Sequence, residues 1–281
     1  MNSGAGGGVA MAVGVSGGAS GGSELVTYAA SSVGVVTITL NSPKNRNALS
    51  AAVMAALSGA LSRAEAAAGT RVVVLRATGP AFSSGHDIKE MRQLQERGSE
   101  DGAAALFSQC ARLMMQVVRL PVPVIAAVHA VATAAGCQLA ASCDIVLADR
   151  TATFATPGVT IGLFCSTPAV ALTRAVGAKK AAVMLYTGLP QSAEDMRTAG
   201  LVNTVVEDDV HAAADELAEH IARQPTAVIK AGKATLLQQA GKPLGDAYDI
   251  AAAAMCTNLL RQPDATEGIA AFVGKRKPRF L

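Results

Sequence analysis

The sequence of 281 residues contains no tryptophan and has only three tyrosines and six phenylalanines. Its net charge at pH 7 is +3, and its main basic cluster is the short C-terminal segment KRKPRF. Proteins that bind nucleic acid generally need a broad basic face and aromatic rings on which bases stack. No apolar run reaches the roughly 18 residues that a membrane span requires. We therefore expect a soluble protein with no nucleic-acid partner and no membrane span.

Cysteine and histidine are also sparse, and they show no metal-site pattern. The five cysteines are an odd number without a CxxC pair, which is typical of reduced thiols in an intracellular protein. The four histidines lack ligand spacing, so no metal site is expected. No Lys or Arg precedes Lys44, whereas secretory and mitochondrial leaders both carry basic residues. These features favour the cytoplasm.

Ala and Val supply most of the apolar residues, which make up 51% of the chain and are enough for a sizeable core. Residues 1–22 consist of low-complexity Gly, Ala and Ser, and we expect a disordered tail there. The remaining chain divides into a mixed region, 23–205, and a mainly helical region, 206–281.

The mixed region alternates strand-like and helix-like patterns. The predicted strands are 24–30, 34–40, 71–78, 122–130, 143–149 and 152–156. The predicted helices are 50–69, 89–95, 103–120, a helix from Gly136, and 166–177, and the segment 79–88 is predicted to be a loop. This β-β-α-β-α-β order predicts an α/β domain whose site lies in loops at strand ends.

From about Ser192 onward the pattern is nearly all helical, apart from 201–206. Helices without a sheet to cover must bury their apolar faces elsewhere, and a neighbouring subunit is the expected place.

The segment Ala134–Asp144, AAGCQLAASCD, follows an apolar strand and opens a helix on a glycine. Such a helix start directs free backbone N–H groups at whatever lies in front of it. The first side chain that reaches past them is Gln138, whose amide cannot exchange a proton near pH 7. The pattern indicates a site for developing negative charge that lacks an acid.

Five motifs in order carry a family resemblance: SPKNRNALS, FSSGHDIKEM, PVIAAVHAVATAAGCQLAASCDIVLAD, FATPGVTIGL and EGIAAFVGKRKPRF. Together they resemble the enoyl-CoA hydratase/isomerase (crotonase) superfamily. The resemblance implies a spiral of ββα units with a helical C-terminal trimerisation region. Region 23–205 would then bind acyl-CoA and region 206–281 would form a homotrimer or hexamer. Coenzyme A would be part of the substrate, no separate cofactor is implied, and the mitochondrial matrix becomes an alternative location.

The resemblance also implies site residues. The backbone N–H groups of His86 and Ala135 would hold the thioester oxygen as it gains enolate charge, and removing one such donor typically costs about 10²–10³ in rate. Lys44 and Arg46 would lie near the CoA phosphates. The other implied CoA contacts are Ala48, Ser84, His86, Asp87, Ile88, and Phe272 and Lys275 from a neighbouring subunit.

Hydratases of this family use two glutamates, and the corresponding positions here hold Gln138 and Gly158. Positioned acid–base groups contribute about 10²–10⁴ each, so their loss argues against efficient hydration. The His86 ring or the Cys165 thiol could supply a group instead. The alternatives are a ring that only lies over the CoA arm and a buried, inert cysteine.

Other polar residues near these motifs have structural interpretations. Asp144 is expected to bind backbone N–H groups, and His129 to pack or bond the backbone. His211 and His220 are expected to face solvent from a C-terminal helix.

Three functions fit this pattern. The first is an acyl-CoA enzyme of fatty acid metabolism with weak or altered lyase or isomerase activity. The second is an acyl-CoA-binding or regulatory protein without turnover. The third is a scaffold protein with a vestigial site.

Overall fold

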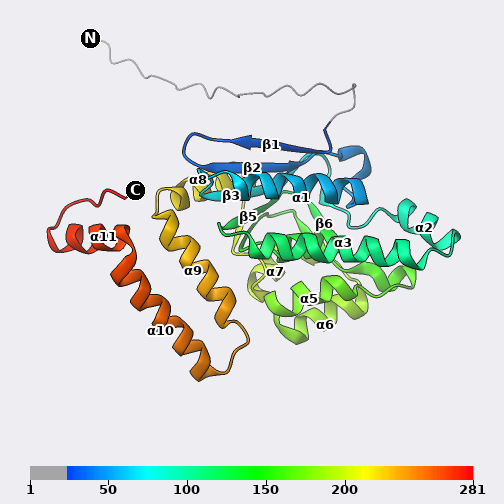
Figure 1. The fold of residues 1–281 in the computed structure, drawn as a ribbon. Helices are drawn as coiled ribbons and strands as arrows, with labels where there is room; N and C mark the ends of the chain where they lie inside the picture. Colours follow the sequence, from blue (N-terminus) through cyan, green and yellow to red (C-terminus); the bar gives the residue numbers. More distant parts are fainter. Residues whose placement is uncertain (1–23, 281) are drawn as a thin grey trace, which may run out of the picture.

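The computed structural model describes residues 24–280, and it confirms the α/β class. The predicted tail, 1–22, lies outside the described residues, so its disorder stays a prediction. Two sheets form the centre of the molecule, and helices cover them (Figure 1).

The first sheet has the strand order β1-β2-β3-β5-β7-β10. Its strands are β1 (Val26–Ala30), β2 (Val35–Leu40), β3 (Val72–Ala77), β5 (Val124–Val128), β7 (Ile145–Asp149) and β10 (Thr204–Val206). All neighbours are parallel except the β1–β2 pair, which is an antiparallel hairpin.

The second sheet is smaller and has the order β4-β6-β8-β9. Its strands are β4 (Ala81–Ser83), β6 (Val131–Thr133), β8 (Thr153–Ala155) and β9 (Gln191–Ser192). The pairs β3/β4, β5/β6 and β7/β8 each give one strand to the first sheet and the next strand to the second. Each turn of chain therefore advances both sheets by one strand, which is the spiral that the sequence resemblance implied.

Helices and short 3₁₀ turns connect these strands, and further helices follow the last strand, β10. They are η1 (Pro43–Asn45), α1 (Ala51–Ala66), α2 (Ile88–Glu96), α3 (Glu100–Arg119), α4 (Ala135–Ala141), η2 (Pro157–Ile161), α5 (Ser166–Ala175), α6 (Gly177–Thr187), α7 (Ala193–Ala199), α8 (Val210–Ala222), α9 (Thr226–Gln239), α10 (Leu244–Arg261) and α11 (Pro263–Val273).

Helices bury the first sheet on both faces. In β3, Val73 and Leu75 pack into the large core with α1 and α3, whereas Val72 and Val74 pack against α8. A parallel strand covered on both faces needs apolar residues in both directions, which explains the unbroken run at 72–75.

Two expectations from the sequence were wrong in detail. The segment 79–88 is not entirely loop, because Ala81–Ser83 forms β4 and pairs in parallel with β6. Three residues are too few for an alternating pattern to be recognised. The helices after residue 206 were expected to lack a sheet to cover, but α8 buries Val210, Ala214, Ala218 and Ala222 on the first sheet.

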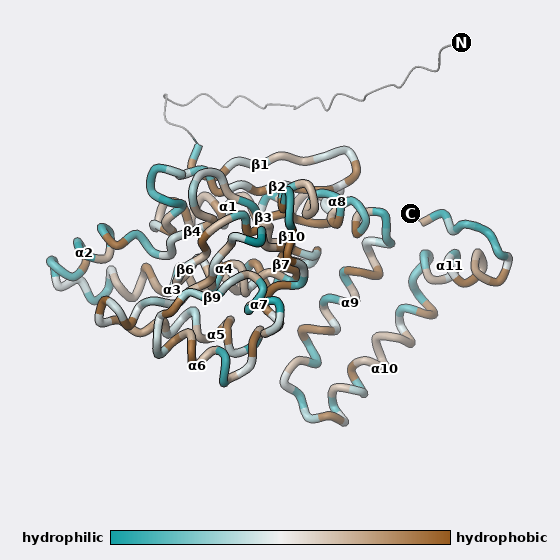
Figure 2. Tube along the Cα trace, turned by 180° about the vertical axis from the view of Figure 1, so that it is seen from behind, coloured by the Kyte–Doolittle hydropathy of each residue, from teal (hydrophilic) through white to brown (hydrophobic). Residues whose placement is uncertain are grey.

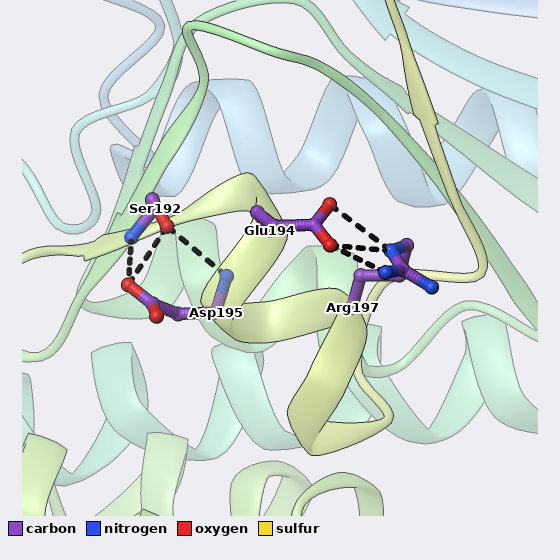
Figure 3. Close-up of polar contacts among 4 residues, drawn as sticks. All are labelled: Ser192, Glu194, Asp195 and Arg197. Carbon is purple, nitrogen blue, oxygen red and sulfur yellow. Dashed lines mark hydrogen bonds and ion pairs between the residues drawn. The ribbon is translucent and has the colours of Figure 1, made fainter.

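The strand β9 leads directly into α7 through a capping box. Ser192 accepts a hydrogen bond from the backbone N–H of Asp195, and the Asp195 carboxylate accepts from the Ser192 backbone N–H (Figure 3). Glu194 in the first turn of α7 forms an ion pair with Arg197, three residues along the helix (Figure 3). The capping-box bonds satisfy donors that a helix start leaves free, and so they fix where α7 begins.

The helices α9, α10 and α11 form an arm that extends away from the sheets (Figure 1). The helix α10 (Figure 2) has no buried residue and exposes Leu244, Tyr248, Met255 and Leu260. No helix among residues 24–280 is long and apolar enough to cross a membrane.

Candidate functional site

The loop after β4 and the first turn of α4 are in direct contact. Gly85 has φ +85°, and a β-carbon there would lie 2.8 Å from Ala134 Cβ and 3.1 Å from Ala135 N. A β-carbon on Gly136 would overlap the backbone carbonyl of Ser83. Both glycines are required because backbone packs against backbone at this point.

This contact places two backbone donors, those of His86 and Ala135, beside each other in the chain's fold. Neither N–H donates to a backbone carbonyl in residues 24–280. Ala135 is the first residue of α4, and no side chain caps that helix start. The donors expected from the sequence are therefore adjacent and unpaired, as an anion-stabilising pair would require.

Ala134 immediately precedes α4, and its backbone conformation sets the direction in which that helix begins. Its φ is +50° and its ψ is −120°, a conformation that favours glycine. Its N–H donates to Ala155 O at 2.9 Å, and its carbonyl accepts from Gln138 N at 3.0 Å. The strained residue is thus fixed on both sides by the second sheet and by α4.

The His86 ring is packed inside the protein and does not face open space. Both ring nitrogens are enclosed without a hydrogen-bond partner among the described residues. The ring meets Phe107 edge-on, with centroids 5.4 Å apart. Burial lowers the pKa of His86, and the Leu49 backbone and Glu90 oppose that shift only in part. The ring is therefore neutral near pH 7, and in this arrangement His86 offers its backbone N–H alone.

The loop expected to bind CoA lies against the loop that carries His86. Lys44 and Arg46 are exposed, as phosphate-binding side chains would be, and Ala48 is buried. The N–H of Ser84 donates to Arg46 O at 3.0 Å, and the N–H of Leu49 donates to Gly85 O at 2.7 Å. Basic side chains and oxyanion donors therefore belong to one connected unit.

Sequence analysis missed Asn47, which holds this unit together. Its buried Nδ2 donates to Thr78 O and Ala81 O, both at 2.8 Å, and its Oδ1 accepts from Ser42 N at 2.8 Å. Its φ of +52° suits asparagine, which tolerates the left-handed region. The sequence signal was an Asn three residues before the Ser50 cap of α1, but its long-range partners were not visible.

A cavity of about 700 Å³ opens beside these loops. One wall comes from α2 and α3 and the other from the loop after η2. The residues that line it are mostly apolar and include Ile88, Met91, Leu106, Phe107, Ile161 and Leu163. A cavity of this size and character suits an apolar chain. Of the site residues expected from the sequence, only Ile88 lines this cavity. The other lining residues were missed because no local sequence signal distinguishes a cavity wall from the core.

Asp87 has a local role. Its Oδ1 accepts from the backbone N–H groups of Lys89 at 2.9 Å and Glu90 at 3.4 Å. Asp87 therefore caps α2, one wall of the cavity.

The two positions of the missing acids lie in the same region. Gln138 is 4% exposed on α4, and its Oε1 lies 4.0 Å from the Cys110 sulfur. Gly158 is buried within η2. Neither position offers a group that carries a proton.

Phe272 and Lys275 are not near the other site residues of their own chain. They lie at the end of the arm (Figure 1), and Phe272 is 86% exposed. Their expected contact with a neighbour's CoA stays a prediction.

Of the expectations for the other polar residues, some are confirmed and one is wrong. Asp144 Oδ2 accepts from Val124 N at 2.8 Å, and His129 Nε2 lies 2.8 Å from Gly79 O, which confirms their structural roles. His220 is exposed as predicted. The prediction for His211 was wrong, because its ring is half-buried against the His129 ring, with centroids 5.3 Å apart.

Comparison with known proteins agrees with this geometry. A family model described as enoyl-CoA hydratase/isomerase matches residues 30–281. Enoyl-CoA hydratase domain-containing protein 3, mitochondrial, is 46% identical in Mus musculus over 246 residues, covering 87% of this chain and 81% of the relative. The 2,3-dehydroadipyl-CoA hydratase of Escherichia coli strain K12 is 33% identical, covering 88% of this chain and 94% of the relative.

Solved structures give the same result. The crystal structure of human enoyl-CoA hydratase domain-containing protein 3 superimposes with a TM-score of 0.87 at 43% identity, covering 91% of this chain and 100% of the other. An enoyl-CoA hydratase of Mycobacterium smegmatis gives a TM-score of 0.86 at 45% identity, covering 91% and 98%. On its fold, its site loops and these relatives, the chain belongs to the enoyl-CoA hydratase/isomerase (crotonase) family.

Proposed function

We propose that the protein binds acyl-CoA thioesters and stabilises the thioester oxygen, with weak or altered turnover in fatty acid metabolism. The adjacent, unpaired N–H groups of His86 and Ala135 carry this proposal. Fixed backbone donors stabilise developing enolate charge without reorganising. The apolar cavity of about 700 Å³ would take the acyl chain.

The chemistry of hydration argues for low activity. Adding water across a conjugated double bond needs one group to activate water and another to deliver a proton at the α-carbon. Gln138 and Gly158 supply neither, and the His86 ring nitrogens are enclosed. We expect crotonyl-CoA hydration at least about 10³-fold slower than that of a two-glutamate hydratase, since each acid–base group contributes about 10²–10⁴.

A non-catalytic acyl-CoA-binding or regulatory role is the second candidate, and the same absence of acids favours it. Incubation with a panel of acyl-CoA thioesters, followed by mass spectrometry of the products, separates the two. A new product supports the enzyme, whereas CoA affinity by calorimetry without any product supports the binding protein. Undetectable CoA affinity would contradict both and favour the scaffold alternative.

We also propose a homotrimer or hexamer assembled through the helical C-terminal region. The exposed apolar side chains of α10, together with Phe272, support this assembly. The names of the relatives in mouse and human carry the word mitochondrial, which supports a mitochondrial location over the cytoplasm. Fractionation of cells that express this chain without added tags tests its location.

A further inference from the structure

The space in front of Gly158 is already filled. A β-carbon at this position would lie 2.9 Å from the Cys165 sulfur and 2.9 Å from the Leu163 carbonyl oxygen. It would also lie 3.2 Å from Cys165 N. Because interiors are close-packed, a side chain at residue 158 would displace the segment 163–165. The acid position is thus occupied by another part of the chain and is not an empty space.

The side chain that enters this space is that of Cys165, from the residue directly before α5. Cys165 is 8% exposed and belongs to the large core cluster. Its thiol also lies near Cys137 in the first turn of α4. Burial raises the pKa of Cys137 to about 12, and Cys165 contributes a smaller part of that rise. Cys165 therefore lies between η2 and the helix start that carries the Ala135 donor.

Gln138 gives an independent indication that a ligand belongs here. It is nine-tenths buried, yet its Nε2 donates no hydrogen bond to the described residues, and its Oε1 has only the long sulfur contact to Cys110. Cys110 is buried in the core one helical turn after Leu106 and Phe107, which line the cavity. The Gln138 Nε2 is not one of the fully enclosed polar atoms that lack a partner, so it reaches open space, where water or a ligand completes its hydrogen bonds.

Gln138 and Cys165 lie directly behind the two walls of the cavity. Gln138 contacts Cys110, one turn along α3 from the lining residue Leu106, and Cys165 is two residues from Leu163, which lines the opposite wall. We propose that Cys165 is a specificity-determining residue whose thiol meets the acyl carbons of a bound thioester, in the place that a side chain at residue 158 would otherwise take. This inference rests on the proposed binding of acyl-CoA.

The thiol gives the site a different chemistry from a carboxylate. Burial raises the pKa of Cys165, which keeps the group neutral near pH 7, and the Gly158 backbone opposes that shift only in part. A neutral thiol is weakly polar, so it neither activates water nor delivers a proton as a carboxyl group does. The site then holds enoyl and saturated thioesters and adds water to the enoyl form only slowly.

Affinity labelling of the wild-type protein tests where the thiol lies. In chloroacetyl-CoA, the Cys165 sulfur would attack the carbon that bears chlorine, forming an S–C bond as chloride leaves and the thiol proton passes to solvent. At pH 8 we expect chloroacetyl-CoA to label Cys165 at least about 100-fold faster than chloroacetamide does, because binding holds the reacting atoms together. Excess CoA should suppress the labelling.

The exposed Cys256 is the internal control, since it lies on the arm and should react with both reagents at similar rates. Peptide mass spectrometry reports both sites in one sample. Equal labelling of Cys165 by the two reagents in a protein that binds CoA would overturn the proposal. If calorimetry shows no CoA binding at all, the proposed function itself fails, so the two failures are distinguishable.

Placement of a carboxylate tests the same geometry in a second way. We expect Gln138→Glu with Cys165→Asp to hydrate crotonyl-CoA at least about 10-fold faster than wild type, a fraction of the usual acid–base contribution. Gln138→Glu with Gly158→Glu should gain no more than Gln138→Glu alone, since the side chain at 158 has no space. The reverse ranking, with CoA affinity retained in both variants, would show that residue 158 faces the ligand and Cys165 does not.

Discussion

The Lys233 ammonium lies 2.6 Å from the Asp144 carboxylate and donates a second hydrogen bond of 3.0 Å to Val122 O. Lys233 is the only buried residue of α9, so this pair attaches the first helix of the arm to the sheets. The same Asp144 oxygen accepts from the Val124 N–H at the start of β5. One carboxylate therefore fixes both a strand and a helix.

Breaking this pair should destabilise the protein. Removing one partner of a buried pair costs about 3–5 kcal/mol, and because Asp144 is 32% exposed we expect Lys233→Met to cost about 2 kcal/mol. Urea unfolding measures the change. Lys242→Met, at an exposed position between α9 and α10, should leave the midpoint unchanged. Equal stability of Lys233→Met and wild type would contradict the anchoring role.

Ala134→Gly should stabilise the protein. Alanine at φ +50° is strained, and relief of such strain, less the added chain entropy of glycine, should amount to about 1 kcal/mol. Gly85→Ala should do the opposite, because its β-carbon would lie 2.8 Å from Ala134 Cβ. Gly232→Ala, in open space on α9, is the control and should not destabilise. Thermal unfolding of the three variants gives the ranking.

Stability should fall on acidification, in part because of His211. Burial lowers its pKa below 6.5, and His129 and Arg76 add to the shift. Below that pH the unfolded chain binds more protons than the folded chain, so stability is present above pH 6.5 and is lost as the pH falls through the folded pKa. His211→Gln should reduce the slope of stability against pH between 7 and 5. An unchanged slope in His211→Gln would contradict this contribution.

Arg46→Ala should weaken CoA binding more than binding of a pantetheine thioester that lacks the nucleotide. The side chain is exposed, so its attraction to phosphate should also decrease as salt rises. Calorimetry at two salt concentrations measures both effects. Arg119→Ala, at the exposed end of α3, is the matched control. Equal losses for both ligands would remove Arg46 from the phosphate-binding role.

The arm should assemble the protein. Tyr248 and Met255 are 70% and 69% exposed on α10, and burying such side chains is worth roughly 1.5–3 kcal/mol each. Tyr248→Lys with Met255→Lys should therefore shift a trimer or hexamer toward monomer at micromolar concentration, as measured by light scattering. Wild-type protein that is monomeric under the same conditions would contradict this assembly.

The sequence by itself determined the local elements and the family. Its patterns predicted a strand at 71–78 and a helix from Gly136, and five ordered motifs indicated the family. Asp144 and His129 could also be interpreted correctly, because Asp144 begins a strand after a helix and His129 ends a strand, and backbone groups at such ends need partners. These inferences depend on neighbours within a few positions of the chain.

Only the tertiary structure decided how distant segments meet. The three-residue β4, the position of α8 on the sheet and the cross-links of Asn47 all depend on partners far along the chain. The enclosure of the His86 ring and the position of the Cys165 thiol in front of Gly158 also depend on the folded chain. Periodicity shows which face of an element is apolar, but the partner that covers that face is chosen by close packing of the whole chain.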